Sequence, residues 1–492
     1  MNSSIPKISE KVLRRIVPGK RERERVYALS EELVQRVSRA ARTASLKAEV
    51  SVQGSVAKDT WLSGEADIDI FLRVDAGLSR AQLETTCLAV AKEAIRGYRA
   101  IERFAEHPYI EAFIGSSRVN IVPCYNVKKG MWKSATDRTP YHTEYVKEHL
   151  DAALRNEVRL LKRFMKGIGT YGAEIRIGGF SGMLCEILIL YYRSFQKTLQ
   201  AASRWREGTI IDLENLLGGD YEDAYDLFDR SLIVIDPVDK ARNVAAAVRD
   251  EKLWEFVAFS RAFLSAPSLK FFFPPKRKWM SRNEFLRKLD GRETSLVGLA
   301  FGRIDAPVDV VWGQIFKTEK SIARFLQTRG FEVMRSSSFS NEGDLNLVII
   351  ELQNEILPKS MKRIGPPVER ASESSRFLEA HLRAKDTLSG PWIEKDRWVV
   401  LKARRQLRVS EILREALRDG GQSIGVPSLV AEAVRKKRFS LLTGRQLSRL
   451  LKSGEFSEFI SAYLRGEPRW LRWRPVDFPQ LESDSFEPSK HP

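Results

Sequence analysis

Apolar and polar residues follow two different periods in the first 144 residues of the chain. Apolar positions recur at helical spacing over 21–44 and 78–96, which predicts two helices. Elsewhere they alternate with a period of two between turn residues, which predicts strands. The expected strands are 48–53, 66–74, 109–114 and 118–124, the last two as an antiparallel pair. This order of elements predicts a compact α/β head over residues 1–144.

Helical periodicity dominates the next segment, which is expected to form a helical neck over 145–270. The helix predicted over 156–166 is amphipathic, and a polar face of this kind is usually solvated. That face carries Arg155, Arg159, Lys162 and Lys166. Further helices are expected over 181–195 and 254–264.

Strand patterns return after Pro274-Pro275 and predict a mixed α/β body over 271–364. A final region, 365–470, is expected to be helix-rich and basic, and the polar residues 471–492 are expected to be disordered. The body is expected to contain strands at 295–301, 332–335 and 345–352 with a helix over 315–328. The chain is therefore predicted to be an α/β multi-domain protein.

The charge of the chain points to a polyanionic partner. Its 492 residues carry a formal net charge of +18, and neutralising phosphates releases condensed counterions. An acidic membrane surface is the competing explanation, but no segment approaches the roughly 20 apolar residues of a membrane helix. Basic residues concentrate in Lys402-Ala-Arg-Arg405 and Arg435-Lys-Lys-Arg438, which favours nucleic acid. Only three cysteines occur, without disulfide or zinc spacing, so a cytoplasmic location is expected.

Asp67 and Asp69 are the strongest candidates for chemistry. Alternate side chains on a strand share a face, so both carboxylates project from one face of the predicted sheet. Two ionised carboxylates this close favour a cation between them, and Mg²⁺ commonly uses such ligands together with substrate phosphates. Just ahead, Gly54-Ser55 offers backbone amides and a hydroxyl to a triphosphate. The combination predicts metal-dependent nucleotidyl transfer.

Polymerases of this kind need a third acidic group on a neighbouring strand, and the candidate strand is 118–125. At this strand the chain resembles the archaeal-type CCA-adding enzymes, class I tRNA nucleotidyltransferases, whose corresponding strand reads like V-D-[IV]-V-P-C-Y. The resemblance covers about the first 270 residues in family order, with a looser echo at Arg363-Ile-Gly-Pro366. Its motifs are Gly54-Ser55, Asp67-Ile-Asp69, His107-Pro-Tyr109, Asp137-Arg-Thr-Pro-Tyr-His142, Asn156-Glu-Val-Arg-Leu-Leu-Lys162, Tyr171-Gly-Ala-Glu174, Gly179-Phe-Ser-Gly182, Leu184-Cys-Glu186, Asp236-Pro-Val-Asp239, Arg242-Asn-Val-Ala245 and Ala266-Pro-Ser-Leu269.

The resemblance implies a polymerase-beta-like nucleotidyltransferase head that adds C, C and A to the 3′ end of tRNA from CTP and ATP without a template. It implies that Asp67 and Asp69 hold Mg²⁺. It assigns nucleotide binding to Gly54, Ser55, Lys58, His142, Lys162, Tyr171 and Arg242. The family usually has arginine where this chain has Lys58, so a planar fork is replaced by a point charge. Arg242 matches the arginine that helps to select the incoming base.

Several of these residues also have a structural interpretation. His142 follows a proline and could cap a helix, and Lys162 could belong to the solvated face described above. Tyr171, beside a glycine, could be a turn aromatic. Arg242 could pair with an aspartate of the segment that precedes it, Asp236 or Asp239, as a loop clamp.

Asn120 is the important departure from the family, which has aspartate at this position. An amide oxygen is neutral and cannot accept the proton of the primer hydroxyl, so the activity of the chain depends on what replaces the acid. Three interpretations stay open: a silent tRNA-binding homologue, a working site in which Glu111 supplies the carboxylate, and slow chemistry on two aspartates. A hairpin loop of two residues would face Glu111 towards Asn120, and a loop of three would face it away.

The resemblance also suggests partners and one further activity. The carboxy-terminal regions would clamp the acceptor stem and TΨC arm of tRNA by shape and phosphate contacts. Family members commonly dimerise, although no residue here indicates a homodimer. A transferase that adds A or U tails of open length to RNA is the alternative enzyme.

Overall fold

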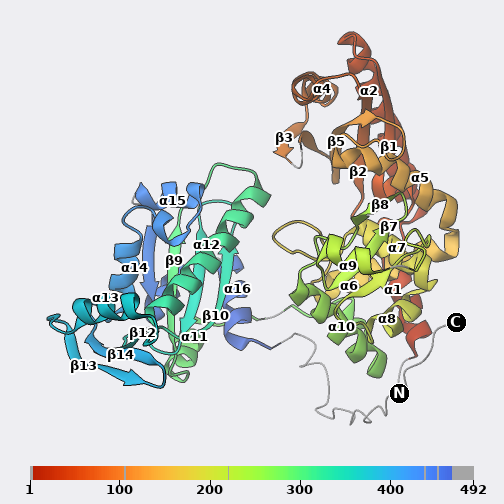
Figure 1. The fold of residues 1–492 in the computed structure, drawn as a ribbon. Coiled ribbons are helices and arrows are strands. Elements are labelled where there is room, and N and C mark those ends of the chain that lie inside the picture. The colour runs from red at the N-terminus through yellow and green to blue at the C-terminus, as the bar shows by residue number, and fades with distance from the viewer. Residues whose placement is uncertain are drawn as a thin grey trace. The chain divides into compact units, whose positions relative to one another are not determined.

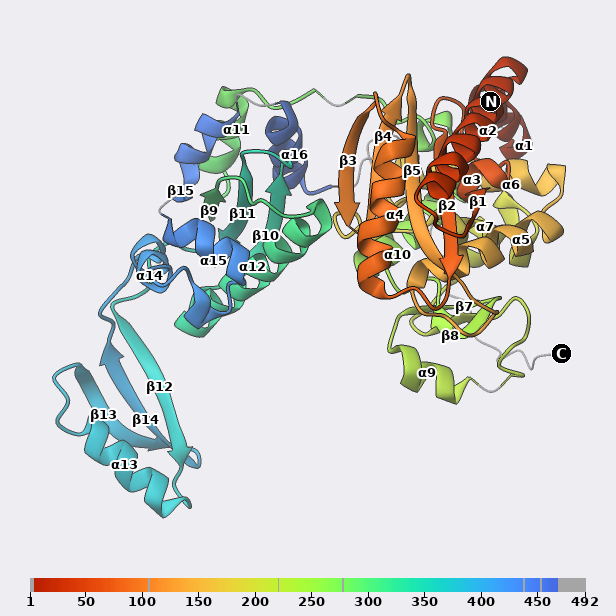
Figure 2. The same cartoon turned by 90° about the horizontal axis from the view of Figure 1, so that it is seen from above.

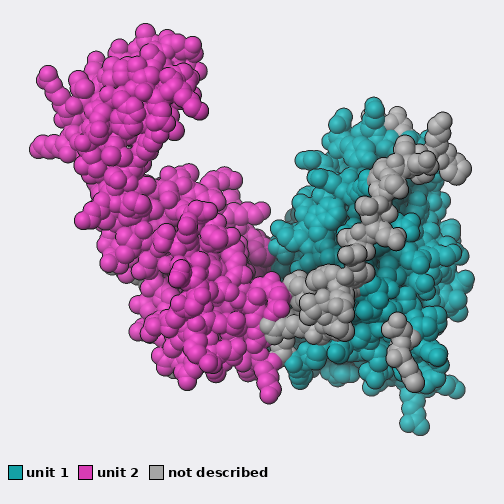
Figure 3. Space-filling model, turned by 90° about the horizontal axis from the view of Figure 1, so that it is seen from below, with its two compact units in different colours: residues 1–276, 468–492 teal, residues 277–467 magenta. Residues whose placement is uncertain are grey.

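A computed structural model describes residues 4–104, 107–219, 221–276, 278–436, 439–451 and 454–467. The chain divides into two compact units, one extending to residue 276 and the other running from 277 to 467 (Figure 3). The tail predicted over 471–492 lies outside the described residues. The finer domain limits proposed from the sequence stay predictions. Within the described ranges, no helix is long and apolar enough to cross a membrane.

A five-stranded sheet forms the head of the first unit (Figure 1). Its order is β1 (Ala48–Gln53), β2 (Asp67–Asp75), β5 (Ser117–Asn126), β4 (Pro108–Ile114) and β3 (Arg99–Phe104). Strands β2 and β5 run parallel, and the other neighbours are antiparallel. Helices α2 (Lys20–Thr43) and α4 (Arg80–Ala94) pack on one face, where Ile68 and Ile70 are buried between them. Asp67 and Asp69 alternate with these isoleucines and therefore lie on the other face.

The neck surrounds a second core that is rich in phenylalanine. Its helices are α1 (Ile5–Ile16), α5 (Thr139–His149), α6 (Ala152–Ile168), α7 (Gly182–Tyr192), α8 (Phe195–Ala202) and α10 (Asp250–Ser265). Rings of Phe164 and Phe263 meet edge to face with centroids 5.3 Å apart, an arrangement that aromatic pairs favour. A small sheet joins β6 (Thr209–Ile211), β7 (Leu232–Asp236) and β8 (Asp239–Asn243), and α9 (Glu222–Phe228) precedes β7.

The polar face of α6 is solvated only in part, because Lys166 is exposed whereas Arg159 and Lys162 are buried. Arg159 and Lys162 are only 2% and 3% exposed. This face of α6 packs against the loop that follows α3 (Gly54–Ala57) in the head. There Arg159 binds the Asp59 carboxylate and the Trp61 carbonyl, and Lys162 donates to the hydroxyl and the carbonyl of Thr60. Periodicity predicts which residues share a helix face but not what covers that face.

The second unit is built on an antiparallel sheet that is packed on both faces. Its order is β10 (Val333–Ser340), β11 (Asn346–Leu352), β9 (Ser295–Phe301) and β15 (Phe439–Thr443). One face packs on α12 (Val308–Arg329), α14 (Val409–Ala416) and α15 (Ser428–Arg435). The other face packs on α11 (Arg282–Asp290) and α16 (Gly454–Arg465).

The region after residue 365 contains several helices, as expected, but also strands that the sequence analysis missed. A three-stranded sheet, β12 (Ser360–Pro367), β14 (Arg397–Ala403) and β13 (Thr387–Glu394), carries helix α13 (Ala371–His381) beside it (Figure 2). Further along, β15 joins the larger sheet. These strands were missed because charged residues such as Lys362 and Glu394, which pair with each other, interrupt the apolar alternation.

Candidate functional site

The two carboxylates predicted from the sequence lie together at the start of β2. In the sheet register, Asp67 stands opposite Arg118 of β5, and Asp69 stands between Gln53 of β1 and Asn120 of β5. Cross-strand partners point to the same face of a sheet. All of these side chains therefore project away from α2 and α4.

Both carboxylates have partners on β5. Arg118 donates from Nε to Asp67 Oδ1 at 3.0 Å and from Nη2 to Asp67 Oδ2. Asn120 Nδ2 donates to Asp69 Oδ1 at 2.8 Å. Burial raises the pKa of Asp69 to about 6, while the Asn120 hydrogen bond and the Arg118 charge act in the opposite direction. The pair is thus held by a neutral donor and one cation.

The donor set of this face fits a divalent cation with hard oxygen ligands. Asp67 and Asp69 provide two carboxylates, and the Oδ1 atom of Asn120 is buried without a hydrogen-bond partner. Mg²⁺ typically takes one or two carboxylates and completes its shell with water and substrate phosphates. Among the described residues, no group of three His, Cys, Asp or Glu side chains could hold a metal by itself. The site fits a cation that the substrate helps to bind.

Gly54 is required by this geometry. Its φ of +69° is in the left-handed region, and a Cβ atom placed on it would lie 2.1 Å from Asp69 Oδ2. The glycine predicted to begin the triphosphate loop therefore allows the backbone to pass directly beside the carboxylate.

We expect Gly54→Ala to lower kcat/KM by at least about a hundredfold, because the methyl group must displace Asp69 from its position. Gly64→Ala is the matched control, since Gly64 also has a positive φ, +77°, but its Cβ would meet nothing within 4 Å. The control shares the backbone strain and lacks the collision. Equal losses of activity in the two variants would contradict this explanation.

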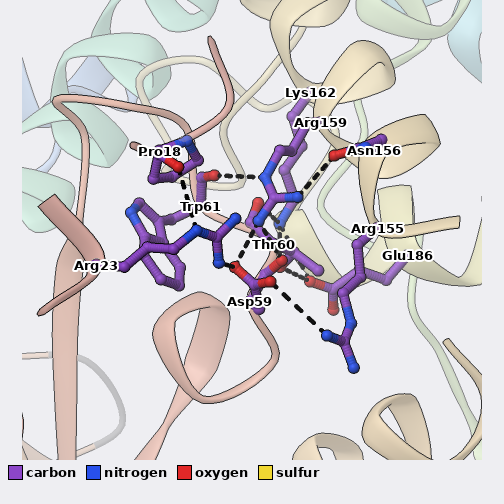
Figure 4. A network of polar contacts seen from close by, with 10 residues as sticks. All are labelled: Pro18, Arg23, Asp59, Thr60, Trp61, Arg155, Asn156, Arg159, Lys162 and Glu186. Atoms are coloured by element: carbon purple, nitrogen blue, oxygen red, sulfur yellow. Dashed lines mark hydrogen bonds and ion pairs between the residues drawn. The ribbon is translucent and has the colours of Figure 1, made fainter. Parts of the chain in front are cut away.

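Lys58 and Lys162 both pair with Glu186, a carboxylate to which the sequence analysis assigned no role. Figure 4 shows Glu186 beside Lys162 and Thr60. Glu186 of α7 is fully buried and forms ion pairs with Lys58 Nζ through Oε2 and with Lys162 Nζ through Oε1, the latter at 3.1 Å. Thr60 donates to the same carboxylate at 2.7 Å. The signal for Glu186 was available, because it is the one acidic residue in the apolar helix 182–192.

A second carboxylate, Asp59, ties the head to the neck in the same region (Figure 4). Its Oδ1 accepts from Arg159 Nη2 at 2.6 Å and from Arg23 of α2, and Arg155 lies 3.7 Å from its Oδ2. Arg159 also donates to the Trp61 carbonyl at 3.0 Å. The loop that follows α3 is thus clamped on α6, which fixes the position of Lys58.

His142, Asp236 and Arg242 form a third polar group. His142 Nε2 lies 2.8 Å from Asp236 Oδ2, and Arg242 Nη1 donates to the same oxygen at 2.6 Å. His142 is a buried residue within α5 and does not cap that helix. Burial lowers the pKa of His142, although the neighbouring Asp236 acts to raise it. Arg242 makes the loop contact considered from the sequence, yet its side chain stays 39% exposed.

Tyr171 and Lys162 converge on the start of α7. A Cβ atom placed on Gly182, the first residue of that helix, would lie 3.2 Å from the Tyr171 hydroxyl and 3.6 Å from Lys162 Nζ. A helix N-terminus presents unpaired backbone N–H groups and favours anions. Burial raises the pKa of Tyr171 well above its usual value, so the hydroxyl is a neutral donor.

The hairpin register brings Glu111 to the same face as Asn120. Ile114 pairs with Ser117, which leaves a loop of two residues, and Glu111 stands directly opposite Asn120. Its carboxylate is engaged, since Arg103 donates from Nε and Nη2 to Oε1 at 3.0 and 2.9 Å. Arg118 Nη1 lies 3.7 Å from the other oxygen, Oε2.

Comparisons with known proteins identify the family of the chain. Family models match a nucleotidyltransferase domain at residues 31–146, the second domain of tRNA nucleotidyltransferases at 156–273 and the C-terminal domain of CCA-adding enzymes at 292–444. A CCA-adding enzyme from Methanothermobacter thermautotrophicus is 38% identical over 82% of this chain and 87% of its own length. That from Methanosarcina acetivorans is 34% identical over 94% of this chain and 99% of its own.

Solved structures resemble the chain less closely. A cytoplasmic RNA terminal U-transferase covers 54% of this chain and 97% of its own, at 17% identity and a TM-score of 0.44, and this likeness carries no argument. The assignment to a family rests instead on the two CCA-adding enzymes described above, which are similar to this chain over 87% and 99% of their own length. The chain belongs to the CCA-adding enzyme family of tRNA nucleotidyltransferases.

Proposed function

We propose that this protein adds C, C and A to the 3′ end of tRNA from CTP and ATP, with the carboxylate face of β2 as its reaction centre. The observation that carries the proposal is the row in which Asp67 and Asp69 of β2 face Arg118 and Asn120 of β5 beside Gly54. Family membership supports the reaction, and this row of side chains supports the proposed position of the reaction centre.

Asp67 and Asp69 would hold Mg²⁺ in this proposal, with the Asn120 amide oxygen as an additional neutral ligand. The ion would neutralise phosphate charge and align the tRNA 3′-hydroxyl with the α-phosphorus. Gly54 lets the chain pass close to the Asp69 carboxylate, because a Cβ at this position would collide with it. Because Asn120 adds no negative charge, we expect binding of the ion to depend on the phosphates of the incoming nucleotide.

The nucleotide phosphates would bind beside Glu186. Two lysines share this one buried carboxylate, so the cluster of Lys58, Lys162 and Glu186 has a surplus of one positive charge. Lys58 lies close enough to affect the pKa of Asp69, and Asp67 affects that of Tyr171. The start of α7 adds backbone donors. An anion bound here would lie within electrostatic reach of the carboxylate face. Ser55, next to Gly54, is proposed to contribute its hydroxyl.

Arg242 is proposed to read the incoming base after Asp236 has fixed its position. One Nη atom is held by Asp236, whereas the side chain keeps 39% of its surface exposed. A guanidinium has five N–H donors, so one ion pair leaves others for a base edge or a phosphate. His142 holds Asp236 from the other side and would act with it.

Incubation of the purified chain with tRNA that lacks its CCA end, Mg²⁺, CTP and ATP tests the proposal, with products resolved at single-nucleotide length. Extension by three nucleotides is expected. No extension with retained tRNA binding would favour a silent homologue, and a ladder that continues past CCA would favour an A or U tailing transferase.

Binding of tRNA is proposed to use the basic surface of the second unit, which would contact the acceptor stem and TΨC arm. Affinity should then fall steeply as salt rises, because phosphate contacts release counterions. Three buried, unpaired cysteines support a reducing compartment such as the cytoplasm. A homodimer stays a prediction that the molar mass in solution can test.

We expect Asn120→Asp to raise the rate of nucleotide addition at least about tenfold, because a third carboxylate would bind the ion more strongly and could accept the proton of the 3′-hydroxyl. Single-turnover rates at saturating Mg²⁺ measure the effect. Without metal the same variant should be less stable, since Asp69 would lose a donor and gain a like charge. An unchanged rate would show that the site works with another base.

A further inference from the structure

Arg118 occupies both oxygens of one of the two carboxylates proposed to hold metal. Its Nε and Nη2 atoms bind Asp67 as a fork, the strongest geometry for an arginine–carboxylate pair. The two side chains are 46% and 40% exposed, so both are accessible from solvent. A divalent cation and this guanidinium would compete for the same oxygens.

A second acceptor for Arg118 lies on the neighbouring strand. Arg103 binds Glu111 only through Oε1, with both of its donors on that oxygen. The remaining oxygen, Oε2, is 3.7 Å from Arg118 Nη1, and the Glu111 side chain is only 6% exposed. Arg118 therefore stands between two carboxylates, fully paired with one and within a short shift of the other.

We propose that Arg118 is a transferable counter-ion, which pairs with Asp67 in the metal-free protein and moves to Glu111 when a divalent cation takes Asp67. This inference rests on the proposed role of Asp67 as a metal ligand. Glu111 then has a definite task, which is to receive the displaced guanidinium and not to replace the carboxylate missing at Asn120. The positive charge stays inside the site, and a buried carboxylate gains a better partner.

The exchange has two consequences for the metal-free protein. The repulsion between Asp67 and Asp69 is offset by a cation that the chain itself supplies. Affinity for metal is lowered in proportion, because only the fraction of molecules with Asp67 released can bind the ion. Arg118 would thus make metal binding weak until the nucleotide phosphates contribute ligands.

Binding of Mn²⁺ to the full chain without nucleotide, followed by the electron paramagnetic resonance signal of the free ion, tests the first step. Arg118→Gln should bind Mn²⁺ about tenfold more tightly than the natural protein, within the range of couplings between sites. Arg99→Gln is the matched control, because it removes an equal charge from the same row of the sheet. Arg99 lies on β3, where its guanidinium stands over the Phe113 ring. Equal tightening in both variants, or none in Arg118→Gln, would overturn the proposal.

A double-mutant cycle with Glu111 tests the transfer itself. Glu111→Gln removes the acceptor, so it should weaken Mn²⁺ binding about tenfold in the natural protein and have little effect in the Arg118→Gln background. Simple attraction between Glu111 and the ion predicts equal weakening in both backgrounds, and that result would refute the transfer. Arg118→Lys, which keeps the charge but loses the fork, should give an intermediate affinity.

Asp67→Asn separates this inference from the proposed function. If that variant binds Mn²⁺ as tightly as the natural protein, the metal assignment fails and the counter-ion role fails with it. If Asp67→Asn abolishes binding while Arg118→Gln leaves the affinity unchanged, only the counter-ion role fails. Circular dichroism of each variant confirms that a loss of binding is not a loss of fold.

Discussion

Replacing Asp69 by asparagine is expected to abolish CCA addition, with a loss of at least about a thousandfold in single-turnover rate. The change preserves the size of the side chain and an oxygen that can accept from Asn120, but it removes one of the two negative charges of the site. Metal-assisted transfer draws several kcal/mol of stabilisation from the ion, and each 1.4 kcal/mol corresponds to about tenfold in rate. With Asn120 already neutral, Asp67 alone would have to hold the ion.

Asp75→Asn provides the control for this experiment, because it makes the same change on the same strand. Asp75 ends β2, is exposed and accepts a hydrogen bond from the Gly77 amide. Its variant should retain nearly full activity. Substantial CCA addition by Asp69→Asn at saturating Mg²⁺ would refute the metal assignment, provided that tRNA binding and circular dichroism are unchanged.

Local pattern was sufficient to predict the strands that build the carboxylate face. Strand β1 spans Ala48–Gln53 as expected, and β2 and the β4–β5 hairpin begin and end close to the predicted residues. Alternation within one strand already placed Asp67 and Asp69 on a common face. The residue that stands opposite Asn120 could not be predicted. It depends on whether the loop of the β4–β5 hairpin has two or three residues, and the sequence left this length open.

The partners of the charged residues could not be predicted, because they come from distant parts of the chain. Lys58 and Glu186 are 128 residues apart, and Arg159 is 100 residues from Asp59. Helical periodicity marked Arg159 and Lys162 as polar-face residues, and such faces are usually solvated. Only packing of α6 on the head turns them into buried ion pairs. The strands after residue 360 were not predicted for a related reason, because their exposed charged residues interrupt the alternation of apolar and polar positions.

We expect Glu186→Gln to destabilise the first unit by about 3–5 kcal/mol at pH 7, because it leaves two buried lysines without a charged partner. Urea unfolding measures the loss, and hydrogen exchange in α6 and α7 assigns it to this unit. Glu65→Gln is the control: Glu65 pairs with Arg163 and Lys166 of the same helix but is 37% exposed. Because an exposed ion pair contributes about 0–1 kcal/mol, Glu65→Gln should lower the free energy of unfolding by no more than that.

The pH dependence of this loss follows from the pKa of Glu186. Burial alone would raise that pKa, but the charges of Lys162 and Lys58 and the hydrogen bonds from Lys58 and Thr60 outweigh it and lower the pKa from 4.5 to about 2. A group whose pKa is lower in the folded state contributes its full stability at pH values above its unfolded-state pKa. This contribution is lost as the pH falls through the folded-state pKa. The difference between natural protein and Glu186→Gln should therefore be constant above about pH 5 and narrow from 4.5 towards 2. A difference that stays constant down to pH 3 would show that packing, and not the charge of Glu186, holds the two lysines in place.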